Sequence, residues 1–237
     1  MNNVKFFFKN YAFMLKKCNA CTIILLVVAL LISISGFFYG FDANQVISDA
    51  KLIDVNAGIF LPMLAVLFSF FIGLNFFKFV KNYNLSVRYQ NLASISVVLT
   101  FCTLMAIVFG ISVYFTHVIA YASNSQVVPI VYNKSFGEVL TGMFAVFLYS
   151  LLASSIGYFL AKLVSVSGYF SVLLIGYVCL IFYAFQYGGY TDDNFVLVVI
   201  NFILNENNIG LLVAKVIPFA ILFFGLDHLI CEKRGVR

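Results

Sequence analysis

The sequence predicts an all-α polytopic membrane protein with six transmembrane helices. Of the 237 residues, 63% are hydrophobic and only 10% are charged, and the apolar residues gather in long runs. Soluble domains carry about 25% charged residues, so lipid is the expected solvent of this chain. The distribution of lysine and arginine between the runs gives the orientation. We expect a single transmembrane domain over residues 1–237, without a separate soluble domain.

Each of six apolar runs is long enough for a helical crossing. A hydrocarbon core about 30 Å thick requires roughly 20 apolar residues per helix, and a helix satisfies its own backbone hydrogen bonds in lipid. The predicted spans are 22–40, 58–80, 93–116, 138–161, 167–186 and 210–230. A cleavable signal peptide is the alternative for the first run, because lysines precede it. That run is too long for a signal peptide, so we expect it to be retained.

The basic residues alternate between the two sides of the predicted bundle. Eleven lie on one side, in the segments 1–21, 78–92, 162–166 and 231–237. Only three lie on the other side, at Lys51, Lys134 and Lys215. The positive-inside rule therefore places both termini in the cytoplasm of a protein that crosses the cell membrane. The net charge of +5 is a topology signal, and without a concentrated basic stripe we expect no nucleic-acid partner.

Two segments are neither spans nor plain loops. Residues 4–17 are amphipathic, which predicts a helix lying in the inner interface of the membrane. One face carries Phe7, Tyr11, Met14 and Leu15, and the other carries Lys5, Lys9 and Lys16. Residues 195–204 are apolar but too few to cross, and acids bound them on both sides. This length predicts an interfacial or re-entrant element on the outer face, between the last two spans.

Catalytic, metal and cofactor sites have little support in the sequence. Cys18 and Cys21 form one C-x-x-C pair, without the second pair or the histidines that a metal site requires. Ser154 and Ser155 in the fourth span lack the G-x-S-x-G turn of a nucleophilic serine, and His117 lies near an outer boundary of the membrane. We therefore expect no enzyme activity and no metal or cofactor. The chain also lacks a G-x-x-x-x-G-K-[ST] loop, so ATP-driven work would need a separate ATPase.

Three polar side chains lie in the last apolar run. A charge inside a bilayer costs roughly 3 kcal/mol on insertion scales, so each of them requires an explanation. We expect Lys215 to extend toward the outer interface, and Asp227 and His228 to meet water at the inner headgroups. Lys215 and Asp227 are too far apart along one helix to pair.

Small residues recur at a spacing typical of close helix contacts. Ala153, Gly157 and Ala161 follow one another every four residues, and Gly36 with Gly40 forms a G-x-x-x-G at the outer end of the first span. Such stripes let two helix backbones approach closely. The prediction for both stripes is helix packing in preference to substrate binding.

The layout of these segments resembles that of type-2 ATP-binding-cassette (ABC) exporter permeases, bacterial six-helix membrane subunits that pair with a separate ATPase. The resemblance rests on the amphipathic start, the short basic loop after the second span, the small-residue fourth span, the outer segment before the last span and the short basic tail. In that family the loop after the second span docks on the ATPase. The resemblance assigns this coupling role to Asn84, Ser86, Val87, Arg88 and Tyr89. A basic loop that only holds the orientation is the alternative.

The resemblance also implies the function and the partners. The chain would be the membrane-spanning subunit that exports a peptide, a drug or a lipid-like amphipathic substrate, for example an antimicrobial peptide. ATP would be hydrolysed by a separate ABC ATPase subunit, and a second permease copy or a paralogue would complete the transporter in the bilayer. A membrane immunity or scaffold protein without transport activity is the second hypothesis, and an intramembrane enzyme is the third.

Overall fold

The computed structural model describes residues 2–39, 55–83, 87–122, 135–168, 176 and 208–235. Five long helices make up this part of the chain: α1 (Asn2–Tyr39), α2 (Val55–Tyr83), α3 (Val87–Ala122), α5 (Phe136–Ser167) and α8 (Ile209–Gly235). All five are long and apolar enough to cross a membrane, which confirms the all-helical class for the described residues. The predicted span 167–186 lies almost entirely outside these residues, and the predicted segment 195–204 lies wholly outside them.

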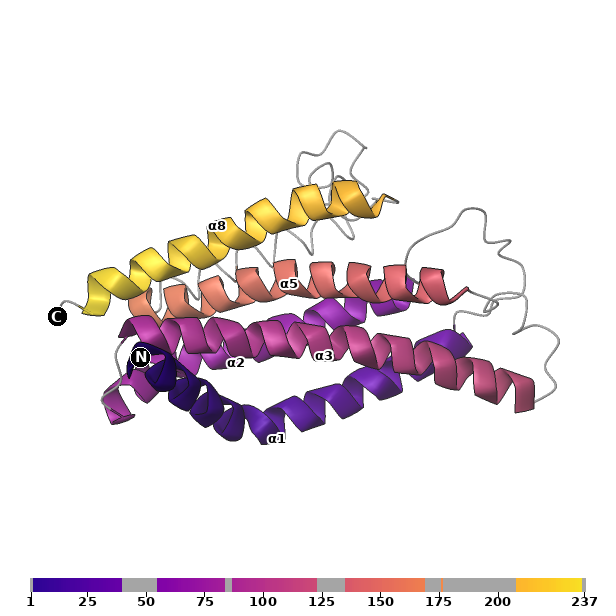
Figure 1. Cartoon of the computed structure of the whole chain (residues 1–237), viewed down its shortest axis with the longest axis horizontal. Helices are drawn as coiled ribbons and strands as arrows, with labels where there is room; N and C mark the ends of the chain where they lie inside the picture. Colours follow the sequence, from indigo (N-terminus) through magenta and orange to yellow (C-terminus); the bar gives the residue numbers. More distant parts are fainter. Residues whose placement is uncertain are drawn as a thin grey trace.

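Helices α2, α3 and α5 pack against one another and form the centre of the bundle. Helix α1 packs against α2 and α3, whereas α8 packs against α5 and α3, so α1 and α8 lie on opposite sides of this centre (Figure 1). Consecutive helices α1, α2, α3 and α5 alternate in direction, and α8 runs parallel to α5 (Figure 1). As a result, one end of the bundle holds the start of α1, the end of α2, the start of α3 and the final turns of α5 and α8. We call this the terminal end.

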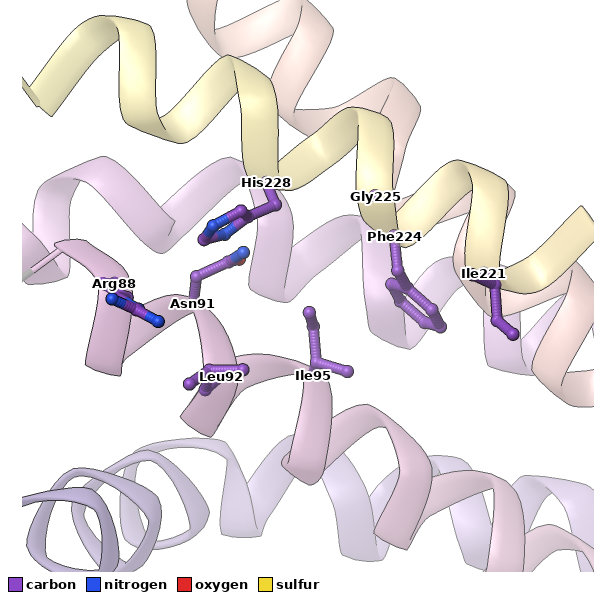
Figure 2. Close-up of a pocket in the computed structure, with 8 residues that line it drawn as sticks. All are labelled: Arg88, Asn91, Leu92, Ile95, Ile221, Phe224, Gly225 and His228. Atoms are coloured by element: carbon purple, nitrogen blue, oxygen red, sulfur yellow. The ribbon is translucent and has the colours of Figure 1, made fainter. Parts of the chain in front are cut away.

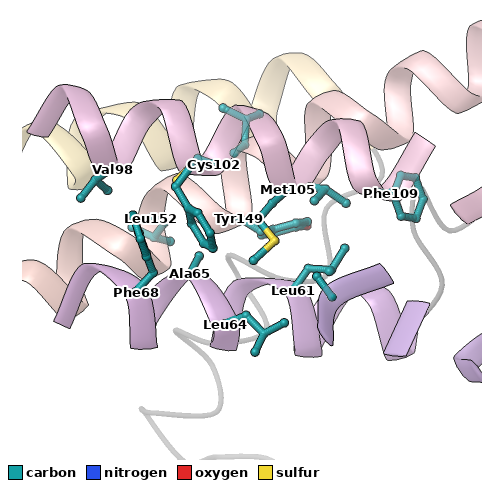
Figure 3. Close-up of a cluster of buried hydrophobic side chains, with 14 of the residues drawn as sticks. Leu61, Leu64, Ala65, Phe68, Val98, Cys102, Met105, Phe109, Tyr149 and Leu152 are labelled. Atoms are coloured by element: carbon teal, nitrogen blue, oxygen red, sulfur yellow. The ribbon is translucent and has the colours of Figure 1, made fainter. Parts of the chain in front are cut away.

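Apolar side chains from three helices fill the centre (Figure 3). Phe68 of α2 stacks on Phe101 of α3 with 3.9 Å between the ring centroids. Helix α2 also comes very close to α5: a Cβ added at Gly73 would lie 2.6 Å from the Cβ of Ala161, and one added at Gly157 would lie 2.9 Å from the carbonyl oxygen of Val66. Only residues this small permit such a backbone approach.

The outer surface of the bundle is apolar as well. Ile24, Leu67 and Ile221 are 62%, 58% and 65% exposed. Polar side chains such as Asn91 and Ser154 are instead fully buried between helices. Contiguous apolar surface of this kind is unfavourable in water and is the expected surface of helices surrounded by lipid, so the side-chain distribution agrees with membrane insertion.

Helix α1 differs from the two elements predicted for its sequence. It continues from Asn2 to Tyr39 without interruption, so the amphipathic start and the first span form one helix, which is bent in Figure 1. The apolar face predicted for the lipid interface contacts α3 instead: Met14 is buried, and the hydroxyls of Tyr11 and Thr100 are hydrogen-bonded at 2.8 Å. Lys5 and Lys9 are exposed. Periodicity identifies an apolar face but cannot distinguish a lipid from a neighbouring helix as its contact.

Helix α5 is longer than the predicted span 138–161. Ser135 caps its start, because the Ser135 hydroxyl accepts from the Glu138 N–H while the Glu138 carboxylate accepts from the Ser135 N–H. This reciprocal pair is a capping box. At the other end Gly168 takes a positive φ of 61°, a conformation that favours glycine. The added turns place Lys162 inside the helix, although the sequence analysis assigned it to a basic connection.

Candidate functional site

A buried ion pair lies near the terminal end. Lys162 of α5 and Asp227 of α8 are both 0% exposed, and the Lys162 Nζ lies 2.9 Å from Asp227 Oδ2. The same ammonium group donates a hydrogen bond to the Oδ1 of Asn91 in α3. A single side chain from α5 therefore connects α3 and α8.

Two aromatic rings also contact Lys162. Its Nζ lies 3.8 Å from the ring centroid of Phe76 in α2 and 4.3 Å from that of Tyr158, distances at which a cation is attracted to the ring face. The Tyr158 hydroxyl donates to Asn91 Oδ1 at 3.1 Å. Phe76, Asn91, Tyr158, Lys162 and Asp227 are called the Lys162 cluster below. Through it, α2, α3, α5 and α8 meet around one positive charge.

The ion pair corrects two expectations from the sequence. Lys162 was assigned to a loop and Asp227 to headgroup water, yet both are buried and paired. A buried charge loses several kcal/mol of solvation, and a well-placed partner offsets that loss. The sequence does hold a signal for this pairing, because Lys162 and Asp227 lie near the inner ends of two predicted spans, on the same side of the membrane. What it lacks is the information that these two helices are neighbours.

The Lys162 cluster is not fully hydrogen-bonded. Within the described residues, Asn91 Nδ2 and Asp227 Oδ1 are buried without a hydrogen-bond partner, and so are both amide atoms of the adjacent Gln90. A buried polar group left in this state costs about 1–3 kcal/mol. The cluster therefore combines strong charge-assisted bonds with polar atoms whose bonding capacity is unused.

A groove of about 420 Å³ lies beside the cluster, between α3 and α8. Each helix lines it with the spacing i, i+3, i+4, i+7 that defines one helical face. Its residues are Arg88, Asn91, Leu92 and Ile95 of α3, and Ile221, Phe224, Gly225 and His228 of α8. Figure 2 shows the polar side chains Arg88, Asn91 and His228 together at one end, and Ile95, Phe224 and Ile221 toward the other. Asn91 belongs to both the groove and the Lys162 cluster.

The residues predicted to dock on an ATPase either precede α3 in the sequence or lie in its first turn, beside this groove. Asn84 and Ser86 lie outside the described residues, and Val87 begins α3. Arg88 is exposed and lines the groove toward α8. Tyr89 is half-buried, and its ring meets that of Phe6 in α1 edge-on at 5.7 Å. The first turn of α3 thus contacts α1 on one side and faces α8 on another.

The small-residue stripe predicted for the fourth span lies along α5. Gly157 and Ala161 are buried against α2 and Ala153 is half-buried. In the other stripe, Gly36 lies in α1, and Gly40 lies outside the described residues.

The remaining candidate residues are dispersed. The Ser154 hydroxyl donates to the carbonyl oxygen of Ala65 and so joins α5 to α2, whereas that of Ser155 donates to the carbonyl oxygen of Leu152 within α5. Cys18 is buried and Cys21 is half-buried, and both are free thiols. Across the described ranges, no three His, Cys, Asp or Glu side chains gather closely enough to hold a metal ion.

No protein-family model, curated protein or solved structure matches this chain. The fold and the site together describe a bundle whose described part has five helices apolar enough to cross a membrane. Its distinguishing features are a buried ion pair and a groove with one polar end, both near the terminal end.

Proposed function

We propose that the chain is a multi-pass membrane protein with six spans and cytoplasmic termini, and that it acts as the permease subunit of an ABC exporter. A sixth span at about 167–186 is supported by the position of two helix ends, because α5 ends at the terminal end whereas α8 begins at the opposite one (Figure 1). The exposed Lys5, Lys9 and Arg88 at the terminal end support its cytoplasmic location.

The observation that carries the proposal is the link between the start of α3 and the Lys162 cluster. The expected docking segment leads directly into α3, and only one turn further Asn91 accepts hydrogen bonds from Lys162 and Tyr158. A partner that pushes the start of α3 would move Asn91 relative to Lys162 and Asp227. Force applied at the docking segment is thereby passed to α5 and α8.

The unused bonding capacity of the cluster supports a second arrangement of these helices. Asn91 Nδ2 and Asp227 Oδ1 lack partners here, so a small shift of α3 can exchange hydrogen bonds within the cluster instead of only breaking them. Packed interfaces that have two discrete arrangements are the usual basis of such switching. ATP-driven closure of the separate ATPase would favour one arrangement in each of two permease copies.

The cargo in this proposal is amphipathic: a peptide, a drug or a lipid-like molecule. This class of cargo comes from the resemblance to the exporter permeases, and the aromatic and aliphatic composition of the helices is compatible with it.

Copurification tests the proposal. The chain, expressed with an ABC ATPase encoded by a neighbouring gene, is expected to form a complex in mild detergent. The pair of changes Arg88→Ala and Tyr89→Ala should weaken this complex about tenfold, equivalent to about 1.4 kcal/mol. Lys9→Ala removes an exposed charge from α1 at the same end and is the matched control.

Asn91→Ala separates docking from coupling. Asn91 follows the docking segment in the sequence and is buried. This variant is therefore expected to bind the ATPase normally and to lose transport-linked stimulation of ATP hydrolysis. An ATPase that binds the parent and the Arg88/Tyr89 variant equally well would overturn the docking assignment. A chain that confers resistance to a peptide with every ABC ATPase gene deleted would instead establish the non-transporting immunity role.

A further inference from the structure

We propose that the groove between α3 and α8 binds one anionic phospholipid, with the phosphate at Arg88, Asn91 and His228 and an acyl chain along Ile95, Ile221 and Phe224. This proposal concerns the chain alone and does not depend on an ATPase or on transport.

The polar end of the groove is built to hold an anion. Arg88 supplies a permanent positive charge with a forked set of donors, and the His228 imidazole supplies an N–H in either protonation state. Asn91 is fully buried, and its Nδ2 makes no hydrogen bond within the described residues, although the Asp227 carboxylate lies near it. Asp227, which precedes His228 in α8, is paired with Lys162, so that acid does not cancel the charge of Arg88.

The helix geometry strengthens this preference. Arg88 lies in the first turn of α3, which begins at Val87, and there backbone N–H groups lack intrahelical acceptors and the helix dipole favours negative charge. On α8, Asp227 and His228 are consecutive and therefore point about 100° apart around the helix. Asp227 accepts a hydrogen bond from Lys162, while His228 lines the groove (Figure 2).

The apolar end identifies the anion as part of a lipid. Beyond the polar residues the wall consists of Leu92, Ile95, Ile221 and Phe224, which offer nothing to a free phosphate. Ile221 is 65% exposed and continues into the apolar outer surface of α8 at Leu222. An acyl chain can therefore enter from the side, while its headgroup stays at the basic terminal end, where anionic lipids are attracted.

Gly225 offers a way to close the groove without changing any charge. It lies in the groove wall, and a Cβ added there would meet no atom within 4 Å. Gly225→Leu should therefore fold normally and fill the space that the lipid occupies. Gly137 in the first turn of α5 has equally open surroundings and lies at the opposite end of the bundle, so Gly137→Leu is the matched control.

The test measures phospholipids retained by the purified full chain. The protein is taken from nanodiscs of equal parts phosphatidylglycerol and phosphatidylcholine into mild detergent, and bound lipids are counted by native mass spectrometry. We expect one phosphatidylglycerol to be retained in preference to phosphatidylcholine. Arg88→Gln combined with His228→Gln should weaken retention about tenfold or more, since charge-assisted bonds are lost. Gly225→Leu should also weaken it, and Lys9→Gln and Gly137→Leu should not.

Each other outcome overturns the proposal. Equal retention of the two lipids would mean that the groove accepts any amphipath. Displacement of phosphatidylglycerol by millimolar inorganic phosphate, with Gly225→Leu silent, would mean that the site takes phosphate alone. If the Arg88/His228 variant does not fold, the comparison of Gly225→Leu with Gly137→Leu decides the question, and equal retention by these two contradicts lipid binding in the groove.

Discussion

At the scale of single residues, the pairing of Lys162 with Asp227 follows from the free energy of buried charge. Neither side chain reaches solvent, so each charge depends on the other, 2.9 Å away, and Lys162 also on Asn91 and two aromatic rings. Removing one partner leaves an uncompensated buried charge, whereas removing both leaves a space that apolar side chains can fill. The pair therefore specifies which helices meet more than it adds to stability.

This reasoning gives a prediction for three variants. Lys162→Met and Asp227→Leu, made singly, should each lower the free energy of unfolding by about 3–5 kcal/mol. The double variant should be closer in stability to the parent than either single one. Unfolding by added dodecyl sulfate in mixed micelles measures all three, with Lys9→Met as the exposed control. A double variant that loses as much as the two single losses together would show that the charges do not interact.

At the scale of helices, the close approach of α2 and α5 depends on residues without bulk. A Cβ at Gly157 would lie 2.7 Å from the Ser69 Oγ and 2.9 Å from the Val66 carbonyl oxygen. The serine hydroxyl can rotate away, but the carbonyl belongs to the α2 backbone. The α2 and α5 backbones must therefore move apart locally to admit even one methyl group.

Gly157→Ala is accordingly expected to destabilise the bundle by about 1–3 kcal/mol, the usual range for overpacking. Gly137→Ala, whose Cβ meets no atom within 4 Å, should leave stability unchanged or raise it slightly, because alanine has a higher helix propensity than glycine. Detergent unfolding compares the two variants. Equal stability of both would contradict the α2–α5 distance described above.

The sequence predicts these helices better than it predicts their contacts. Long apolar runs identify five described helices because helical length in lipid depends only on local composition. The predicted end of the fourth span came too early, because α5 continues through the polar residue Lys162. The helix ends at Gly168 because of its backbone conformation, which the apolar pattern does not reveal. The groove and the Lys162 cluster could not be predicted, because both depend on which helices are neighbours: the groove joins α3 to α8, and the cluster joins Lys162 of α5 to Asn91 and Asp227, which are 71 and 65 positions away.

At the scale of the whole molecule, the directions of the helices give a test of orientation. Lys5 and Gly137 are both exposed and are separated in sequence by α1, α2 and α3, which alternate in direction (Figure 1). Three crossings, an odd number, put the two positions on opposite sides of a membrane. If the basic terminal end faces the cytoplasm, as proposed, Lys5 faces inward and Gly137 faces outward.

Cysteine labelling in intact cells measures this directly, after the five native cysteines have been replaced by serine or alanine. A membrane-impermeant maleimide should label the Gly137→Cys variant from outside and the Lys5→Cys variant only after permeabilisation. Arg88→Cys, also exposed at the terminal end, should behave like Lys5→Cys because two crossings separate them. The reverse pattern would invert the bundle and place the docking segment, the Lys162 cluster and the lipid groove at the outer face. Labelling of Lys5→Cys and Gly137→Cys from the same side would mean that one of α1, α2 and α3 does not cross.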